Sequence, residues 1–331
     1  MTLGIALIGA GRIGTNHAAI VARQVPGARL VAVADPVEIA AKRLAAELDA
    51  DAVDVDTLLT RPDIDGVLIT APARSHTDLV VAAAAAGKHV FCEKPMAVTL
   101  ADADRAIAAA EQAGIVLQVG FNRRFAPAFA AARAAIDAGR IGTPQLLRSL
   151  TRDPGPFTAD PARIPQWTIF FETLIHDFDT LCFLNPGAQP VSVHAFADAL
   201  VAPDARDSGH LDTAVVTIRF DNGAIATAEA SFSALYGYDV RGEAFGSAGM
   251  VTAGTSRVTD MTLYDAGGIH VDTARSDTAL LHAAYAGELT AFVEAVRSGG
   301  PSPVPGAAAR TALAIALAAI ESVKTGKAVA L

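Results

Sequence analysis

Six residues near the N-terminus, Gly9-Ala10-Gly11-Arg12-Ile13-Gly14, constrain the fold of this chain more than any other segment. They follow an apolar run at residues 3–8 and open an alanine-rich stretch that is typical of a helix. Between a strand and a helix, the first glycine permits a tight turn, the second lets the backbone approach a diphosphate, and the third lets the helix pack on the strand. The N-terminus of that helix offers N–H groups to the phosphates. The motif therefore predicts a dinucleotide site formed by Gly9, Gly11, Arg12, Ile13 and Gly14.

An acidic residue stands where such a site needs one. Asp35 lies 21 residues beyond Gly14, at the end of the second apolar run. Its carboxylate would accept hydrogen bonds from both ribose hydroxyls and would repel a 2′-phosphate. Because Pro36 follows, and not a phosphate-binding arginine, the pattern favours NAD over NADP. The alternative for Asp35 is a solvated carboxylate at a strand end.

The first 120 residues repeat the order of strand and helix. Short apolar runs without alternation are typical of strands that are covered on both faces, and each connection is long enough for a crossover helix. The predicted class is α/β, with an N-terminal Rossmann domain (residues 1–120) built on a doubly wound parallel sheet. The expected strands are 3–8, 30–34, 66–70, 89–92 and 115–119, and the expected helices are 13–24, 38–48, 77–86 and 101–113.

The pattern changes after Gly120. Strands with alternating polarity fill residues 191–271, and Asp221-Asn222-Gly223 is typical of a hairpin turn between two of them. The sequence predicts a C-terminal α+β domain (residues 121–331) whose mainly antiparallel sheet carries helices on one face. The other expected elements are helices at 126–138, 172–184, 283–298 and 307–325, a strand at 145–150, and a loop rich in Pro and Gly at 152–165.

Composition excludes several classes of protein. The chain has 26 basic and 35 acidic residues, a net charge of −9, and no run of Lys or Arg, so nucleic acid is not an expected partner. Apolar runs such as residues 311–320 are too short to cross a bilayer, and the N-terminus has no basic start of a signal peptide. The two cysteines make no disulfide framework, and the eight histidines show no metal spacing. We expect a cytoplasmic protein without metal.

Two further groups carry the chemistry. Glu93-Lys94-Pro95 follows a predicted strand, which places Lys94 at the carboxyl edge of a parallel sheet, where ligands bind. Glu172 and His176 stand four residues apart on one helical face, and an apolar stripe of Leu174, Phe178 and Leu181 lies opposite. A carboxylate beside an imidazole suits a general base. The alternatives are a solvated lysine and a surface Glu–His pair without chemistry.

Neighbouring polar residues receive structural interpretations. We expect Asp177 to be solvated or structural and Asp179 to pair with a basic group. His17, in the first helix, is interpreted as a packing or capping residue, and Ser75-His76 as the cap of a helix. Cys92 and Cys182 are interpreted as small buried apolar residues.

Together these motifs resemble the Gfo/Idh/MocA oxidoreductases. The resemblance rests on the glycine motif with Asp35, on His-Val-Phe-Cys-Glu-Lys-Pro at residues 89–95, and on His-Asp-Phe-Asp at residues 176–179. Within that family the chain is most similar to the inositol 2-dehydrogenases, through residues 172–176, 236–239 and 282–285 with Glu288. The resemblance implies a large open sheet in the second domain, and a homo-oligomer, either a dimer or a tetramer. It also implies NAD-dependent oxidation of a ring hydroxyl of a cyclitol or pyranose sugar to a ketone or lactone.

The resemblance also implies roles for individual residues. Lys94 would hold the hydroxyl oxygen near the nicotinamide, and His176 would be the general base. Glu172 would orient His176 or relay its proton. Glu172 replaces the more usual aspartate of the family, and Trp167-Thr168 replaces a glycine pair. These two departures leave the preferred ring open between inositol and another cyclitol or sugar. The remaining residues implied at the site are Thr70, Ala71, Pro72, His76 and Glu93 around the cofactor, and Arg124, Asp153, Tyr236 and Tyr285 around the substrate.

Two other functions stay open from the sequence. One is a glycosidase that retains NAD and shows no net redox change. The other is a non-catalytic regulator that binds a dinucleotide. Lys94 and His176 together favour an enzyme, because a regulator has no need of the pair.

Overall fold

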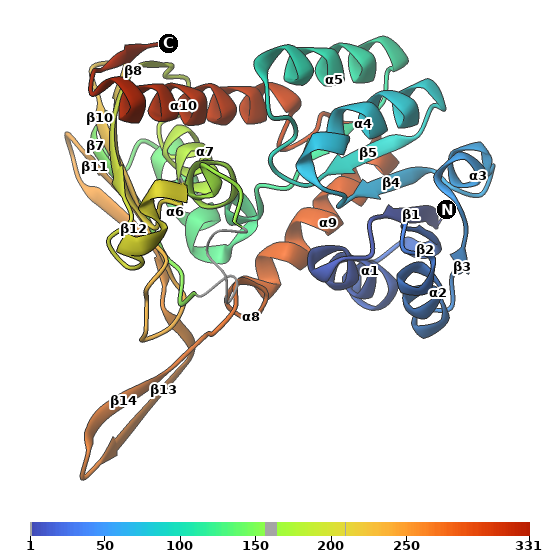
Figure 1. The fold of residues 1–331 in the computed structure, drawn as a ribbon, viewed down its shortest axis with the longest axis horizontal. Helices are drawn as coiled ribbons and strands as arrows, with labels where there is room; N and C mark the ends of the chain where they lie inside the picture. The colour runs from blue at the N-terminus through green and yellow to red at the C-terminus, as the bar shows by residue number, and fades with distance from the viewer. Residues whose placement is uncertain (1, 156–163, 209) are drawn as a thin grey trace. The chain divides into compact units, whose positions relative to one another are not determined.

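The computed structural model describes residues 2–155, 164–208 and 210–331, and these form two compact units (Figure 1). Unit 1 comprises Met1–Asn122 and Ala283–Leu313, and unit 2 comprises Arg123–His282 and Ala314–Leu331. The change of unit at residue 122 lies close to the expected domain boundary. The expected second domain ran without interruption to residue 331, whereas residues 283–313 group with unit 1. Residues 156–163 of the expected loop lie outside the described residues.

Unit 1 contains a six-stranded sheet in the order β3-β2-β1-β4-β5-β6, in which every neighbouring pair is parallel. The doubly wound parallel sheet is confirmed, and each expected strand is present. The additional strand β3 has two exposed residues, too few for an apolar run to reveal it. The strands are β1 (Leu3–Ile8), β2 (Ala28–Ala34), β3 (Asp51–Ala52), β4 (Gly66–Ile69), β5 (His89–Cys92) and β6 (Leu117–Val119).

Helices cover the sheet of unit 1, and two of them have clear start signals. Asp54 and Thr99 accept hydrogen bonds from main-chain N–H groups in the first turns of α3 and α5. Ser75 stands at the N-cap of α4, as expected, but its side chain makes no capping hydrogen bond. The helices are α1 (Arg12–Gln24), α2 (Glu38–Glu47), α3 (Val55–Thr60), η1 (Ala73–Ser75), α4 (His76–Ala85), α5 (Leu100–Ala113), α9 (His282–Ser298) and the start of α10 (Gly306–Thr325).

Long-range contacts explain why residues 283–313 join unit 1. Phe292 of α9 packs edge-on against Phe91 of β5, with ring centroids 6.0 Å apart. The carboxamide of Gln118 donates a hydrogen bond to the carbonyl of Glu288, and the main-chain N–H of Val119 donates to Val304. The apolar core of unit 1 is therefore completed by a segment that lies far away in the sequence.

Unit 2 contains a seven-stranded sheet in the order β12-β11-β7-β10-β9-β8-β15 and a separate hairpin, β13-β14. Neighbours in the large sheet are antiparallel except β7 and β10. The mainly antiparallel sheet is confirmed. The strands are β7 (Pro144–Arg152), β8 (Pro190–Asp198), β9 (Thr213–Phe220), β10 (Ile225–Ser231), β11 (Asp239–Gly246), β12 (Met250–Thr255), β13 (Arg257–Asp265), β14 (Gly268–Thr273) and β15 (Val329–Ala330).

One face of this sheet is covered by helices and the other is open (Figure 1). Strand β9 shows the pattern, because its residues alternate between buried and exposed along its length. On the covered face, Ser322 of α10 accepts a hydrogen bond from the main-chain N–H of Ala195 in β8. The helices of unit 2 are η2 (Asn122–Phe125, across the boundary), α6 (Pro127–Asp137), η4 (Ile169–Leu174), α7 (Ile175–Phe183), η5 (Pro203–Ser208), α8 (Asp277–Leu280) and the end of α10.

Helix α10 is apolar over a longer stretch than its sequence pattern suggested. Among the described residues it is the one helix whose length and composition would suit a membrane span, and 56% of its apolar window is buried within the fold. Leu313, Ile315 and Ile320 are among its buried side chains. Packing inside the protein therefore accounts for its composition.

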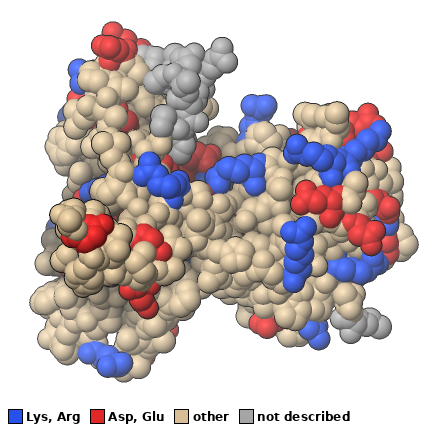
Figure 2. Space-filling model, turned by 90° about the horizontal axis from the view of Figure 1, so that it is seen from below, with Lys and Arg blue, Asp and Glu red and all other residues tan. Residues whose placement is uncertain are grey.

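Charged side chains of both signs are intermixed on the face shown in Figure 2. Ion pairs near the surface of the protein include Arg61 with Asp51 and Asp63, and Arg105 with Asp78. Exposed pairs of this kind add little to stability.

Candidate active site

The glycine loop of unit 1 has the geometry that its motif predicts. Gly9 has φ = +107°, a backbone conformation that favours glycine, and a Cβ atom on Gly14 would lie 1.9 Å from the carbonyl oxygen of Gly9. A Cβ atom on Gly11 would meet nothing within 4 Å. Two of the glycines are thus required by close packing, and the third borders open space at the start of α1. A diphosphate placed there would meet the N–H groups of the first helical turn.

Asp35 holds this loop to the end of β2. One carboxylate oxygen accepts a hydrogen bond from the main-chain N–H of Ala10, and the other accepts one from Val37, both at 2.7 Å. A carboxylate oxygen has two lone pairs, so each still has acceptor capacity for a ribose hydroxyl. The loop and Asp35 together fit an adenosine-ribose diphosphate, as NAD requires.

The loop after β4 lies against the glycine loop and is fixed from within. Thr70 donates a hydrogen bond from its hydroxyl to the carbonyl of Gly9 at 2.7 Å. The two ring nitrogens of buried His76 lie 2.6 Å from the carbonyl oxygen of Ala71 and 2.8 Å from that of Pro95. Both nitrogens therefore face main chain, and His76 connects the loop at residues 70–72 to the loop that contains Lys94. Its expected cofactor contact stays a prediction.

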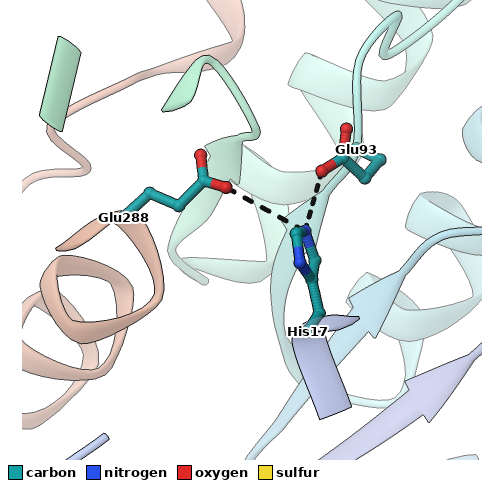
Figure 3. A group of neighbouring side chains, drawn as sticks. All are labelled: His17, Glu93 and Glu288. Atoms are coloured by element: carbon teal, nitrogen blue, oxygen red, sulfur yellow. Dashed lines mark hydrogen bonds and ion pairs between the residues drawn. The ribbon is translucent and has the colours of Figure 1, made fainter. Parts of the chain in front are cut away.

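Lys94 follows β5, at the same carboxyl edge of the sheet as the glycine loop and Asp35. Its neighbour Glu93 was expected at the cofactor, but the carboxylate of Glu93 lies in the interior of unit 1. Glu93 Oε1 is 2.7 Å from Nε2 of buried His17, and Glu288 Oε1 is 3.9 Å from the same nitrogen (Figure 3). The interpretation of His17 as a packing residue missed this cluster, because a histidine in an alanine-rich helix does not reveal its partners.

The two carboxyl groups of this cluster have opposite shifts. Burial, with a smaller contribution from the charge of Glu93, raises the pKa of Glu288 well above its ordinary value. Burial also acts to raise the pKa of Glu93, but its hydrogen bond to His17 and the nearby positive charges of His17 and Lys94 lower that pKa overall. Glu93 is therefore the carboxyl group that ionises more readily.

Glu172 and His176 come from unit 2, where the expected helix begins with a π-helical turn, η4, and continues as α7. Glu172 is exposed and His176 is partly buried. The apolar stripe opposite them, Leu174, Phe178 and Leu181, is fully buried, as the periodicity predicted. Packing of that stripe leaves Glu172 and His176 on the more accessible side of the helix. Irregular turns of this kind are frequent at functional sites.

Asp177 is buried, so its expected exposure to solvent is wrong and its structural interpretation holds. Its Oδ1 accepts from Arg123 at 2.8 Å and from the Ser149 hydroxyl at 2.6 Å, and its Oδ2 accepts from the Thr151 hydroxyl at 2.8 Å. These bonds fasten α7 to β7. The helix position next to His176 is thereby fixed.

Arg124, expected to hold a substrate hydroxyl, forms a two-pronged ion pair with Asp179. Its Nε and Nη2 donate to the two carboxylate oxygens, and its guanidinium lies 5.3 Å from the ring centroid of Phe183. The expected pairing of Asp179 with a basic group is confirmed. Arg124 thus has a structural partner, and its contact with substrate stays a prediction.

The other expected substrate residues are divided between the units. In unit 2, Asp153 is buried just after β7, and Tyr236 is exposed and donates its hydroxyl to Asp239 at 2.8 Å. Tyr285 is buried in unit 1, with its ring 5.5 Å from that of His17. Tyr238 is an additional candidate, because burial and the charge of Asp153 raise the pKa of its phenol. Tyr238 lies within residues 236–239, which resemble the inositol 2-dehydrogenases, so the sequence could have suggested it.

These observations define a class: a dinucleotide-binding oxidoreductase with a Rossmann unit and a second α/β unit. The chain belongs to the GFO/IDH/MocA family. Residues 3–121 match the model of an oxidoreductase family with an NAD-binding Rossmann fold, and residues 129–252 match the GFO/IDH/MocA C-terminal domain. NAD is therefore the cofactor of this chain.

Similar proteins share the whole length of the chain. A scyllo-inositol 2-dehydrogenase (NAD(+)) of Bacillus subtilis is 37% identical over 97% of this chain and 94% of its own. A myo-inositol 2-dehydrogenase of Thermotoga maritima is 37% identical over 99% and 98%. A crystal structure of scyllo-inositol dehydrogenase from Lactobacillus casei with bound NAD(H) and scyllo-inositol has a TM-score of 0.94 at 26% identity, covering 100% of this chain and 99% of that one.

Proposed function

We propose that this protein is an NAD-dependent dehydrogenase that oxidises a ring hydroxyl of a cyclitol such as inositol to a ketone. A pyranose sugar, oxidised to a lactone, is the related possibility. The observation that carries the proposal is the position of Lys94, at the sheet edge that also holds the glycine loop and Asp35. The named inositol dehydrogenases that resemble the chain over nearly its full length support the choice of substrate.

The proposed chemistry removes a proton and a hydride from one carbinol group. The Lys94 ammonium donates a hydrogen bond to the substrate oxygen and stabilises negative charge there as the O–H bond breaks. His176 accepts the hydroxyl proton, and the Glu172 carboxylate orients the imidazole and stabilises its charged form. Bound NAD supplies the acceptor for the hydride that leaves the carbon. The carbon–oxygen bond becomes a carbonyl, and the atoms and electrons balance.

The remaining hydroxyls of the ring need polar partners in unit 2. Asp153 and Tyr238 offer an acceptor and a donor side by side, and Tyr236 offers a second phenol. We assign Arg124 and Tyr285 to the wall of the substrate site, each held by its own packing. A ring with several hydroxyls would satisfy more of these groups than a simple alcohol, so polyols are favoured.

The direct test follows reduced nicotinamide by its absorbance with NAD and a panel of inositol isomers and aldopyranoses. We expect turnover with at least one of them, and a loss of about 10²-fold or more in kcat for Lys94→Ala with the affinity for NAD retained. The exposed Lys42→Ala is the matched control. Binding of NAD without turnover of any polyol would contradict the proposal. A glycoside hydrolysis assay would then separate a redox-neutral glycosidase from a regulator.

We also propose that a second copy of the chain covers the open face of the unit 2 sheet. Phe245, Leu146 and Ile225 are half-exposed neighbours across β11, β7 and β10, and Val215 stands on the same face. Exposed apolar groups gathered on one face are typical of an interface. Light scattering after size exclusion should show a dimer or tetramer, and Ile225→Lys should weaken this assembly. A monomeric wild type would refute the proposed interface. The cytoplasmic location stays a prediction.

A further inference from the structure

Three ionisable side chains meet in the interior of unit 1 (Figure 3). His17 comes from α1, Glu93 from the residue after β5, and Glu288 from α9. His17 and Glu288 are 0% exposed and Glu93 is 6% exposed. Burial of ionisable groups is costly unless their charges are paired. The fold bears this cost directly beside Lys94.

Glu93 connects the cluster to Lys94 through both of its carboxylate oxygens. Oε1 accepts from Nε2 of His17 at 2.7 Å, and Oε2 accepts from the main-chain N–H of Lys94 at 3.1 Å. Gly120 leaves room for this arrangement, because a Cβ atom there would lie 3.1 to 3.2 Å from the carboxylate atoms. The carboxylate thus joins α1 to the segment that carries the ammonium.

The hydrogen-bond geometry locates the charge within the cluster. A carboxylate oxygen only accepts, so Nε2 of His17 carries a hydrogen toward Glu93. Neither carboxyl oxygen of Glu288 has a hydrogen-bond partner among the described residues. An ionised Glu288 would be a bare anion in the core, which is the more expensive state. The titratable groups around Glu93 are His17, Glu288, the Cys92 thiol and Lys94.

A metal ion would need a different spacing. Across the described part of the chain this is the one group of three side chains close enough to share an ion. Two ligands on a tetrahedral zinc ion lie about 3.3 Å apart, given bond lengths near 2.0–2.1 Å. The 2.7 Å between His17 and Glu93 is instead the length of a charge-assisted hydrogen bond. The cluster has the geometry of a proton-sharing pair with a neutral neighbour.

We infer that Glu93 is a positioning residue for Lys94: it carries the single negative charge of the cluster, is held in place by His17, and lies beside a Glu288 that keeps its proton. This role rests on the proposed function of Lys94 in oxidation. The fixed anion stabilises the charged ammonium and sets the backbone from which Lys94 extends. His17 and Glu288 act through Glu93 and not on substrate.

The test compares Glu93→Gln with Glu288→Gln, and the exposed Glu111→Gln is the control. The first readout is the rate at which acetic anhydride modifies Lys94 in the holoenzyme without substrate, followed by peptide mass spectrometry. Loss of the carboxylate that accepts from the main-chain N–H of Lys94 should loosen the segment that carries the amine, so this reaction should become about 3- to 10-fold faster. The second readout is the pair kcat and KM. For Glu93→Gln we expect kcat to fall at least about tenfold with KM for NAD little changed, because the variant misplaces the ammonium and leaves the cofactor site intact.

Glu288→Gln carries a neutral amide of the same shape, so it should alter both readouts much less than Glu93→Gln. Glu93→Asp keeps the charge and should restore slow labelling, with partial rescue of kcat, and it covers the case in which Glu93→Gln does not fold. Equal labelling of Lys94 in wild type and Glu93→Gln would overturn the inference, and so would equal effects of the two glutamine variants. A wild type that turns over no polyol would refute the proposed function, while the labelling would still decide the role of Glu93.

Discussion

The two units bury charge in opposite ways. In unit 2, Asp177 is surrounded by donors: Arg123, Ser149 and Thr151 all hydrogen-bond to its carboxylate. In unit 1, Glu288 is equally buried, yet its carboxyl group has no hydrogen-bond partner among the described residues. Both carboxylate oxygens of Asp177 have hydrogen-bond donors, although Nε of Arg123 has no partner among the described residues, whereas neither carboxyl oxygen of Glu288 has one.

The difference indicates what each cluster is for. A buried carboxylate with several donors holds the elements around it rigidly, and removal of the carboxylate leaves those donors buried without an acceptor. A cluster with an unsatisfied member costs stability in the folded state, and such costs are found where a site needs them. The first network fastens α7 to β7, and the second lies directly behind Lys94. We therefore expect substitutions in the network of Asp177 to act on stability and those in the cluster of Glu93 to act on the site.

The largest effect should come from breaking the network of Asp177. Asp177→Ala leaves the buried Arg123 guanidinium without its carboxylate, and the free energy of unfolding should fall by about 3–5 kcal/mol. Urea denaturation followed by circular dichroism measures this loss. Arg123→Met combined with Asp177→Leu removes both charges, and it should recover about half of the loss, because the hydroxyls of Ser149 and Thr151 still lack an acceptor.

A loss below about 1 kcal/mol for Asp177→Ala would remove the distinction between the two clusters. The matched control is Asp137→Ala on α6, whose carboxylate pairs with Arg133 at the surface. That variant should change stability by less than about 1 kcal/mol. The comparison isolates burial, because both carboxylates pair with an arginine.

The second prediction uses pH to separate the two glutamates of unit 1. The pKa of Glu288 is raised in the folded state, so the stability it contributes is full below its ordinary value of 4.5 and is lost as pH rises through the folded value. The pKa of Glu93 is lowered, so its contribution is present above the ordinary value and is lost as pH falls. Relative to wild type, Glu288→Gln should gain stability as the pH rises from 4.5 toward 8. Glu93→Gln should lose stability relative to wild type as the pH rises toward 4.5, and the difference should stay constant above that pH.

Between the pKa of the folded state and that of the unfolded state, the free energy of unfolding changes by at most about 1.4 kcal/mol for each pH unit. Thermal unfolding at several pH values measures it, and Glu111→Gln should run parallel to wild type. Slopes of the same sign for both variants would show that the negative charge is not confined to Glu93. In that case the contrast with Asp177 would also weaken.

Local patterns in the sequence predicted much of this fold. The parallel strands of unit 1 follow from apolar runs separated by helical stretches, and the glycine motif fixes its own geometry within six residues. The stripe of Leu174, Phe178 and Leu181 was correctly placed in the core. The return of residues 283–313 to unit 1 was not predicted, because it depends on contacts such as Phe292 with Phe91, which have no local signal.

The polar residues of the site were harder to place from sequence. Helical spacing tells which residues share a face, but it does not tell how deep that face lies or which partner meets it. Glu93 was therefore expected at the cofactor, and Asp177 was expected to be either solvated or structural, although both are buried. The contacts that bury these two carboxylates come from other elements of the chain. Arg123 contacts Asp177, and His17 and Glu288 lie beside Glu93.

The smallest predicted effect concerns Asp35, the carboxylate of unit 1 that lies at an accessible edge and binds main-chain N–H groups instead of a cation. Asp35→Ser should weaken NAD about tenfold and narrow its advantage over NADP, because the negative charge that repels a 2′-phosphate is gone. Titration calorimetry with each dinucleotide measures both affinities. Asp35→Asn keeps one acceptor oxygen for the two main-chain N–H groups of Ala10 and Val37, so it should retain more of the thermal stability of the cofactor-free protein than Asp35→Ser while it still narrows the NAD preference. If both variants retain the wild-type preference, the ribose is recognised by another residue, and the accessible carboxylate of unit 1 only supports its loop, as Asp177 supports α7 in unit 2.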